Sequence, residues 1–310
     1  MHASFRGACL LLAVALSFAG CRQQEPPVAP ARVPAQAAVI DDLGRPWDGH
    51  LPARRIVSLA PNVTEIVCAV GGQEYLVGID TASDYPPAVK RIPQVGEFLR
   101  PSIERIVSLR PDAVIVSSAT LPAPEADRFA QTLRAPVFVL NPVHLEDVCR
   151  NVRIIGQLLG LEQEAEAVAA KTERRLADVA RRAGGQPRRR VFLEIWHEPL
   201  TTVGGGTFLD DLIRLAGGQN VAASQKKPFP TFSLEALLAA NPEVYIVTTG
   251  MGAAPDPAKR PGLGALRAVR NRRVVSVPGD PVMRPTPRLA EGAEHLLRAI
   301  HPEAQADEAE

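Results

Sequence analysis

The 310-residue chain carries 35 Lys and Arg against 34 Asp and Glu, a formal net charge of +1. Nucleic-acid binding needs a clustered excess of cations to displace counterions, so we expect no nucleic-acid partner. Hydrophobic residues make up 46% of the chain and charged residues 22%, an ordinary globular composition that excludes wholesale disorder. The four cysteines are too few for a disulfide scaffold or a cysteine-rich metal protein.

The first 20 residues have the features of a signal peptide. One firm positive charge, Arg6, precedes an apolar run over residues 8–19. This run is too short to cross a bilayer, which needs about 20 apolar residues. Ala19 and Gly20 precede Cys21 and resemble the lipobox of bacterial lipoproteins, in which that cysteine is acylated after cleavage, although Phe18 stands where Leu is usual. The alternative is an ordinary secretory signal with an incidental Cys21, and both interpretations place the mature protein outside the cytoplasm.

Residues 21–51 are predicted to be a tether, because residues 22–38 are rich in Pro, Ala and Gln. A tether after a lipid anchor would let a folded domain reach away from the membrane. Beyond the signal only Cys68 and Cys149 remain, both within apolar helical patterns. In an oxidising compartment they could pair, and two buried free thiols are the alternative.

A duplication organises the rest of the chain. Residues 102–116 read SIERIVSLRPDAVIV and residues 233–247 read SLEALLAANPEVYIV, with Ser, Glu, Pro, Ile and Val in register. Each copy predicts a short amphipathic helix that begins at a Ser N-cap and ends before a proline, followed by a buried strand. Upstream, residues 55–60 match 190–195 as strands, and residues 64–72 match 209–218 as helices that end in a glycine pair.

The duplication predicts an α/β fold of two similar Rossmann-like lobes, at residues 52–143 and 188–301, each with a mostly parallel sheet. The helical connection between them is residues 144–187, and residues 302–310 are a tail. Within the connection, residues 162–182 contain no Gly or Pro and predict one continuous helix of about 30 Å. A helical connection is stiff, so we expect small motions between the lobes, with a ligand cleft between them beyond the carboxyl ends of the strands.

The signatures of common enzymes are absent from the sequence. There is no nucleophile elbow, no Walker loop and no HExxH motif. The run Gly204–Gly206 lacks the spacing of a dinucleotide fingerprint and indicates a turn that approaches a ligand closely. His144 and His197 fall near predicted lobe edges, which leaves an envelope metal-binding protein or enzyme as a hypothesis from a different class. We expect no enzyme activity, no resident cofactor and no structural metal.

Several motifs together resemble a known family. They are RIVSLAPNVTE at 55–65, VGID at 77–80, SDYPP at 83–87, QVG at 94–96 and SIERIVSLRPD at 102–112. In this order they resemble the solute-binding proteins of iron-chelate and cobalamin ABC importers, most closely those that bind vitamin B12. The resemblance covers nearly all of residues 52–301, and the family fold of two α/β lobes joined by one long helix agrees with the duplication.

The resemblance implies a set of ligand-binding residues that suit a large flat chelate. Aromatic walls supply contact area and a few polar groups fix orientation. Phe98 and Phe229 stand where the cobalamin-binding proteins have Trp, which leaves less contact area. The matching ligand-binding positions in this chain are Tyr85, Phe98, Trp196, Phe229, Asp280 and Arg284.

Glu104 and Glu235 occupy the same place in the two repeats. The resemblance implies that these glutamates, one on each lobe, dock on arginines of a dimeric permease. One charge at each end of the protein suits a two-fold receptor. A modest interaction with the helix dipole is the purely structural alternative.

The expected function is capture of cobalamin or a related corrinoid and its delivery to an ABC importer by a monomeric, lipid-anchored protein. Within the same class the alternative ligands are haem, which usually needs an axial Tyr or His, and a ferric siderophore, which favours cations such as Arg100, Arg284 and Arg288. An anchored adaptor that binds only proteins is the remaining alternative.

Overall fold

The computed structural model describes residues 38–97, 100–117, 123–250 and 255–304. These residues belong to one compact unit. The expected signal peptide, the acylated Cys21 and the aromatic Phe98 lie outside the described residues.

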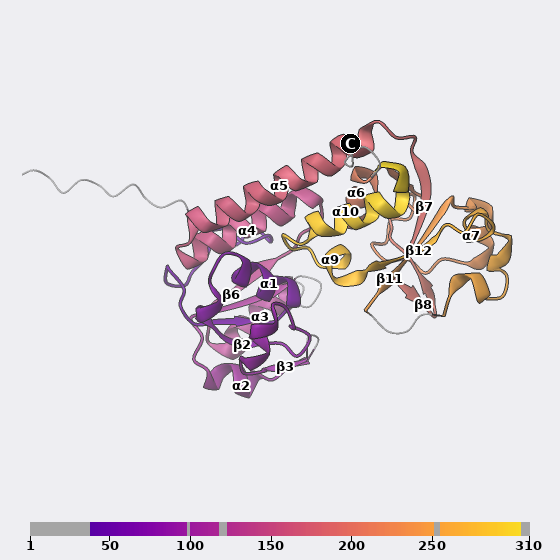
Figure 1. Cartoon of the computed structure of the whole chain (residues 1–310). Coiled ribbons are helices and arrows are strands. Elements are labelled where there is room, and N and C mark those ends of the chain that lie inside the picture. Colours follow the sequence, from indigo (N-terminus) through magenta and orange to yellow (C-terminus); the bar gives the residue numbers. More distant parts are fainter. Residues whose placement is uncertain (1–37, 98–99, 118–122, 251–254, 305–310) are drawn as a thin grey trace, which may run out of the picture. The chain divides into compact units, whose positions relative to one another are not determined.

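Two four-stranded parallel sheets form the frame of the protein (Figure 1). The first sheet has the order β2 (Leu76–Ile79), β1 (Ile56–Ser58), β5 (Ala113–Ser117), β6 (Val137–Leu140). The second has the order β10 (Gly218–Asn220), β7 (Arg189–Glu194), β11 (Val244–Thr249), β12 (Val274–Pro278). Two short antiparallel ribbons pair β3 (Gly96–Glu97) with β4 (Arg100–Pro101) and β8 (Trp196–His197) with β9 (Leu200–Thr201). The two parallel sheets have the same strand order when their strands are matched through the repeats, so the predicted pair of similar α/β lobes is confirmed.

Helices cover both faces of each sheet. In the first half of the chain they are α1 (Pro61–Ala69), η1 (Gln73–Tyr75), η2 (Pro87–Arg91), α2 (Ile103–Ser108), α3 (Ala123–Leu133) and α4 (Leu145–Leu159). In the second half they are α5 (Glu162–Gly184), α6 (Phe208–Leu215), α7 (Leu234–Ala240), η3 (Pro257–Lys259), η4 (Leu263–Ala265), α8 (Arg267–Arg270), α9 (Gly279–Met283) and α10 (Leu289–Ile300).

The strands are apolar throughout because both faces of each sheet are buried. Along β11, Val244 and Ile246 pack into the core under α6 and α10, whereas Tyr245 and Val247 pack into the core under α7 and α8. Strand β5 alternates in the same way between its two cores. A strand buried on both sides therefore reads as a continuous hydrophobic run rather than as an alternating one.

The duplication extends to individual hydrogen bonds. Asp112, which precedes β5, accepts from the backbone amide of Arg55 at 2.9 Å, and Glu243, which precedes β11, accepts from the amide of Arg190 at 3.0 Å. The helix before each strand ends at a residue with positive φ, Arg110 at 45° and Asn241 at 39°. That residue stands immediately before a proline in both copies, so the backbone leaves the helix in the same way in each lobe.

The long connecting helix is confirmed as α5. Its first half places Ala165 and Ala169 in the core of the first lobe, and its second half places Leu176, Val179 and Ala183 in the core of the second lobe. The preceding residues form a separate helix, α4, which lies alongside α5 (Figure 1). A helix that contributes to both cores resists bending, because a bend would open one of them.

Both described cysteines are free thiols, so the disulfide alternative is not realised in this structure. Burial raises the pKa of the Cys68 and Cys149 thiols to about 11, which keeps them protonated at neutral pH. Among the residues that the structure describes, no helix has the length and apolar character needed to cross a membrane.

Candidate functional site

Three of the expected ligand-binding residues follow the carboxyl ends of parallel strands. Trp196 comes directly after β7, Asp280 lies just beyond β12, and Tyr85 lies in the turn after β2. Ligands of open α/β sheets bind beyond these strand ends, so the local topology places the three residues where a ligand site is expected.

A buried polar network fixes the turn that carries Tyr85. The Thr64 hydroxyl lies 2.8 Å from the hydroxyls of both Ser58 and Ser83, and the Ser83 hydroxyl donates to the Asp80 carboxylate. Burial raises the pKa of the Asp80 carboxyl, against the opposing effect of these hydrogen bonds. Because Ser83 is anchored in this way, the next two residues, Asp84 and Tyr85, are held at the surface of the first lobe.

Arg284, on the segment between α9 and α10, reaches from the second lobe to the first. Its Nη1 donates to Glu65 at 2.9 Å and to Asp84 at 2.8 Å, while its Nη2 lies 3.2 Å from Asp280. Asp280 and Arg284, two of the expected ligand-binding residues, therefore pair with each other, and Arg284 is also bound by two carboxylates of the first lobe. Hydrogen bonds to Asp84 and Glu65 raise the pKa of the Arg284 guanidinium, although burial opposes the rise.

Glu65 is the carboxylate at the centre of this contact, and sequence analysis did not identify it. It lies on α1, is 4% exposed, and also accepts from the Thr286 hydroxyl at 3.2 Å. Arg288 lies 3.5 Å from the same carboxylate. Burial raises the pKa of the Glu65 carboxyl, and the two arginines counteract part of that rise.

Arg288 completes the contact by stacking on Tyr85. Its guanidinium carbon lies 3.9 Å from the centroid of the Tyr85 ring, a cation–π arrangement, and Tyr85 remains 41% exposed. We call the residues joined in this way the interlobe cluster: Glu65, Asp84, Tyr85, Asp280, Arg284, Thr286 and Arg288.

The charges of the interlobe cluster are compensated. Two positive groups, Arg284 and Arg288, face three negative ones, Glu65, Asp84 and Asp280, which leaves a formal balance of −1. Arginines bound to carboxylates in a partly buried site offer little free positive charge to a ligand.

Trp196 and Phe229 form a second group of expected ligand-binding residues. Trp196 is 41% exposed, and its indole Nε1 donates to the Glu198 carbonyl at 2.7 Å. Phe229 is exposed between two prolines whose carbonyls accept from the backbone amides of Gly204 and Thr202. The close approach of residue 204 to this segment requires glycine, because a Cβ there would lie 2.0 Å from the Lys227 carbonyl oxygen. The structure thus presents two large aromatic side chains at the surface of the second lobe.

The two predicted docking glutamates lie on matched, exposed helices. Glu104 is in the first turn of α2 and Glu235 in the first turn of α7. The capping hydroxyls behave as predicted, with Ser102 accepting from the Arg105 amide at 3.4 Å and Ser233 from the Ala236 amide at 3.1 Å. Backbone and Ser233 hydrogen bonds lower the pKa of the Glu235 carboxyl.

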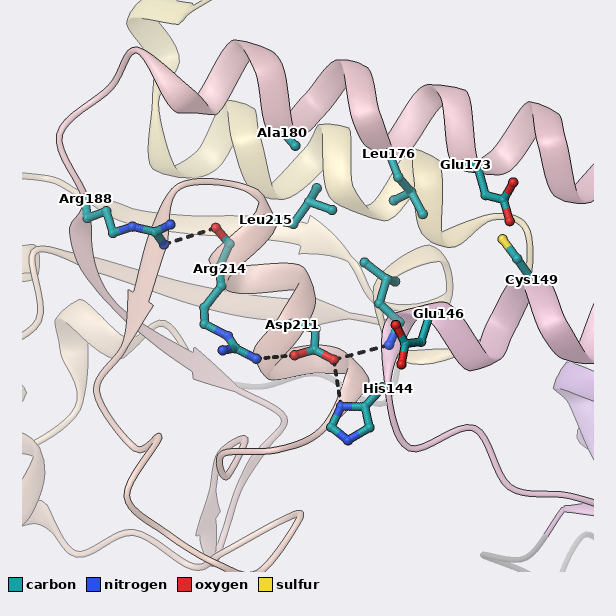
Figure 2. Close-up of a pocket in the computed structure, with 11 residues that line it drawn as sticks. His144, Glu146, Cys149, Glu173, Leu176, Ala180, Arg188, Asp211, Arg214 and Leu215 are labelled. Carbon is teal, nitrogen blue, oxygen red and sulfur yellow. Dashed lines mark hydrogen bonds and ion pairs between the residues drawn. The ribbon is translucent and has the colours of Figure 1, made fainter. Parts of the chain in front are cut away.

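His144 lines a cavity of about 750 Å³ among α4, α5 and α6, and none of the residues that line this cavity belongs to the interlobe cluster (Figure 2). Its Nδ1 lies 3.0 Å from Asp211, which also accepts from the Leu145 amide and pairs with Arg214. These polar groups bind one another across the junction of α4 and α6, which indicates a structural contact between the connection and the second lobe.

The metal hypothesis finds no support in the described residues. His197 stacks on Trp196 with ring centroids 5.3 Å apart, and His144 is paired with Asp211. No group of three or more His, Cys, Asp or Glu side chains in the described ranges is arranged to hold a metal ion.

Comparisons with known proteins agree with this architecture. Residues 56–281 match the family described as periplasmic binding protein. The protein YvrC of Bacillus subtilis, named as an ABC transporter substrate-binding lipoprotein, is 31% identical over 257 residues, which cover 81% of each chain. The structure of the periplasmic vitamin B12 binding protein BtuF of Vibrio cholerae aligns with a TM-score of 0.72 at 28% identity, covering 82% of this chain and 98% of the other.

A third similar protein is named for a different ligand, haem. The periplasmic haem-binding protein RhuT of Roseiflexus sp. RS-1, in its apo form, aligns with a TM-score of 0.72 at 30% identity and covers 82% of this chain and 100% of its own. The matched fold and sequence are those of extracytoplasmic binding proteins rather than of enzymes. This chain belongs to the periplasmic binding protein family, the substrate-binding proteins of ABC transporters.

Proposed function

We propose that this protein captures cobalamin or a related corrinoid between its two lobes and delivers it to the permease of an ABC importer. The observation that carries this proposal is the interlobe cluster, which combines exposed aromatic surface with arginines whose charge is already compensated. The similarity to the vitamin B12 binding protein of Vibrio cholerae supports the same ligand class.

Charge compensation favours a ligand that is polar but carries little charge. A corrinoid presents a broad flat ring for aromatic contact and side-chain amides for hydrogen bonding. Amides can accept from Arg284 and donate to Asp280 without a change in net charge, which leaves the buried Glu65 carboxylate paired. A polycarboxylate siderophore would need the arginines that the carboxylates of the cluster already bind.

Haem is the second candidate, and one observation favours it. The Tyr85 phenol is exposed beside the Arg288 guanidinium, and a phenolate is a known axial ligand of haem iron. The similarity to the haem-binding RhuT points to the same class. The two ligands place different demands on Tyr85, because corrinoid stacking needs only the ring whereas iron ligation needs the oxygen.

Calorimetric titration of the mature protein with cyanocobalamin, with haemin and with a ferric siderophore tests the proposal. We expect a one-to-one cobalamin isotherm with a Kd at or below about 1 µM. Tyr85→Phe keeps the ring and removes the oxygen, so it should leave cobalamin affinity within about threefold, whereas it should abolish an iron–phenolate absorption band in a haem complex. Heat with haemin alone, lost in Tyr85→Phe, would replace the corrinoid with haem.

The two tryptophans of the chain provide a matched pair for locating the site. Trp196→Ala should weaken ligand binding about 10- to 100-fold, the effect of losing about 1.5–3 kcal/mol of buried aromatic contact. Trp47 instead packs edge-on against Phe138 in the first lobe, with ring centroids 5.8 Å apart. Trp47→Ala should therefore lower stability and leave the Kd unchanged; an unchanged Kd in Trp196→Ala would remove this residue from the site.

Glu104 and Glu235 are proposed to dock on the permease, and Cys21 is proposed to carry the lipid anchor. Both glutamates are exposed at equivalent positions of the repeat, so they suit a partner with two equivalent receptor surfaces. The double variant Glu104→Ala/Glu235→Ala should retain ligand affinity while losing ligand uptake in cells that carry the permease. Uptake at the wild-type rate would refute the docking role.

A further inference from the structure

We propose that Glu65 determines the charge selectivity of the interlobe site, by neutralising Arg284 and Arg288 so that anionic ligands are disfavoured. This inference rests on the proposed binding site but not on the identity of its ligand. Nothing in the local sequence marks Glu65 as a ligand-binding residue.

Glu65 is buried where the two lobes meet. A carboxylate that is 4% exposed persists only when it is paired, because an isolated buried charge is strongly unfavourable. Every described partner of its two oxygens comes from residues 284–288 of the opposite lobe: Arg284, Thr286 and Arg288. The pairing therefore forms only when the two lobes meet.

Both arginines beside Glu65 have further carboxylate partners. Arg284 is held by carboxylates on both sides, Asp84 of the first lobe and Asp280 of its own, in addition to Glu65. Arg288 has Glu291 at 4.0 Å and Glu65 at 3.5 Å, with the ring of Tyr85 beneath its guanidinium. Glu65 is the one carboxylate of this set that lies close to both arginines and is itself buried.

A ligand bound beside this cluster interacts with the net charge that Glu65 helps to set. If the Glu65 charge is removed while its shape is kept, the formal balance of the cluster rises from −1 to 0 and two guanidiniums lose a common partner. An anionic group near them then meets a formally neutral site, with two less compensated guanidiniums, where it previously met a negative one. At the distances within one site, a change of one charge alters affinity for an anion by about tenfold.

The test compares Glu65→Gln with Glu291→Gln, which removes the same charge from a half-exposed residue of α10 that pairs with Arg288 alone of the two arginines. Sulfate is the first probe, because it stays a dianion across the usable pH range and requires no knowledge of the natural ligand. Sulfate at low millimolar concentration should raise the melting temperature of Glu65→Gln more than that of wild type or Glu291→Gln. Its general stabilising effect through exclusion from protein surfaces acts on all three alike. An equal response in the three proteins would overturn the proposal.

The second probe is a matched pair of corrinoids, cyanocobalamin and the monocarboxylate obtained by hydrolysing one of its side-chain amides. Wild type should prefer the amide form, and Glu65→Gln should shift the ratio of the two Kd values toward the carboxylate by about tenfold. If wild type binds neither corrinoid, the proposed ligand is wrong while the sulfate result still decides the role of Glu65. If wild type binds both but the ratio is the same in Glu65→Gln, the inference fails and the proposed function stands.

Arg288→Gln provides the converse variant if Glu65→Gln does not fold. It removes a positive charge, so it should strengthen the preference for the amide form over the carboxylate. In the double variant Glu65→Gln/Arg288→Gln the added sulfate response should be lost. A sulfate response that survives in the double variant would show that the anion binds elsewhere and would overturn the assignment to this cluster.

Discussion

Two buried glutamates of this protein bind arginine in contrasting ways. Glu194, at the end of β7, is 1% exposed and accepts from Arg260 through both oxygens at 2.7 Å. The hydroxyl of Tyr245 also donates to Glu194, so these side-chain partners belong to the second lobe. Glu65 is similarly buried, but its partners lie on the opposite lobe.

The lobe that carries the arginine partner determines what each glutamate–arginine pair contributes. A buried ion pair within one lobe forms when that lobe folds, and its geometry does not depend on the ligand. An ion pair that spans two lobes forms and breaks with their approach, so its energy contributes to the equilibrium between open and closed states. We therefore expect substitutions at Glu194 to change unfolding, and substitutions at Glu65 to change closure and ligand selectivity.

The largest expected effect is that of Glu194→Ala. This substitution leaves the partly buried Arg260 guanidinium without its carboxylate and the buried Tyr245 hydroxyl without an acceptor, so we expect a loss of about 3–5 kcal/mol in the free energy of unfolding. Urea unfolding measures it, with the exposed Glu164→Ala on α5 as the control. A loss below about 1 kcal/mol, the usual value for an exposed ion pair, would show that the Glu194–Arg260 pair contributes little to the stability of the second lobe.

A smaller effect on the free energy of unfolding is expected from removing the hydroxyl groups that donate to the two glutamates, Tyr245 to Glu194 and Thr286 to Glu65. Tyr245→Phe should lose about 1.5–3 kcal/mol of unfolding free energy, the usual value for a hydrogen bond to a charged group. Burial and the adjacent Glu194 carboxylate also raise the pKa of Tyr245, so the phenol remains the donor at neutral pH. Thr286→Val removes the longer bond to Glu65, of 3.2 Å, and should cost about 1 kcal/mol or less.

The ligand dependence of these two variants sharpens the comparison. Tyr245→Phe should leave ligand affinity unchanged at temperatures where the variant is folded, because its partner lies within one lobe. Thr286→Val should alter the ratio of affinities for charged and uncharged ligands despite its smaller effect on stability. If Tyr245→Phe changed ligand affinity and Thr286→Val left the affinity ratio unchanged, the contacts of Glu194 within the second lobe, and not the interlobe cluster, would govern binding.

The fold could be predicted from sequence because its signals are local and occur twice. Ser102 and Ser233 cap matched helices, and Asp112 and Glu243 bind the backbone of matched strands, so each copy supports the interpretation of the other. The prediction that Tyr85, Trp196 and Phe229 bind the ligand rests on a resemblance, and it stays a prediction for these exposed side chains.

The interlobe cluster could not be predicted in the same way. Glu65 and Arg284 are 219 positions apart, and no periodicity relates them. One signal was present: Glu65 is the one charged residue of α1, and its neighbours Val63 and Ile66 are apolar and buried. A charge on the buried face of a helix needs a partner, but the sequence does not say which of the 35 cations supplies it.

The smallest expected effect is the pH dependence of the interlobe pair. Burial raises the pKa of the Glu65 carboxyl, so the folded chain binds a proton at pH values where the unfolded chain has already released it. The contribution of Glu65 to the free energy of unfolding is therefore fully present in acid and is lost as the pH rises through its folded-state pKa.

Glu65→Gln isolates this contribution, because the variant has no carboxyl at this position to titrate. The unfolding free energy of wild type minus that of Glu65→Gln should decrease as the pH rises from about 4 to values above the ordinary pKa range of glutamate, because the folded-state pKa of Glu65 is raised. Urea unfolding of both proteins at closely spaced pH values measures this difference, and the raised pKa of Asp80 cancels because both proteins contain that residue. A difference that increases with pH would mean that the two arginines outweigh burial at Glu65, and the charged form of the cluster would then be a source of stability as well as of selectivity.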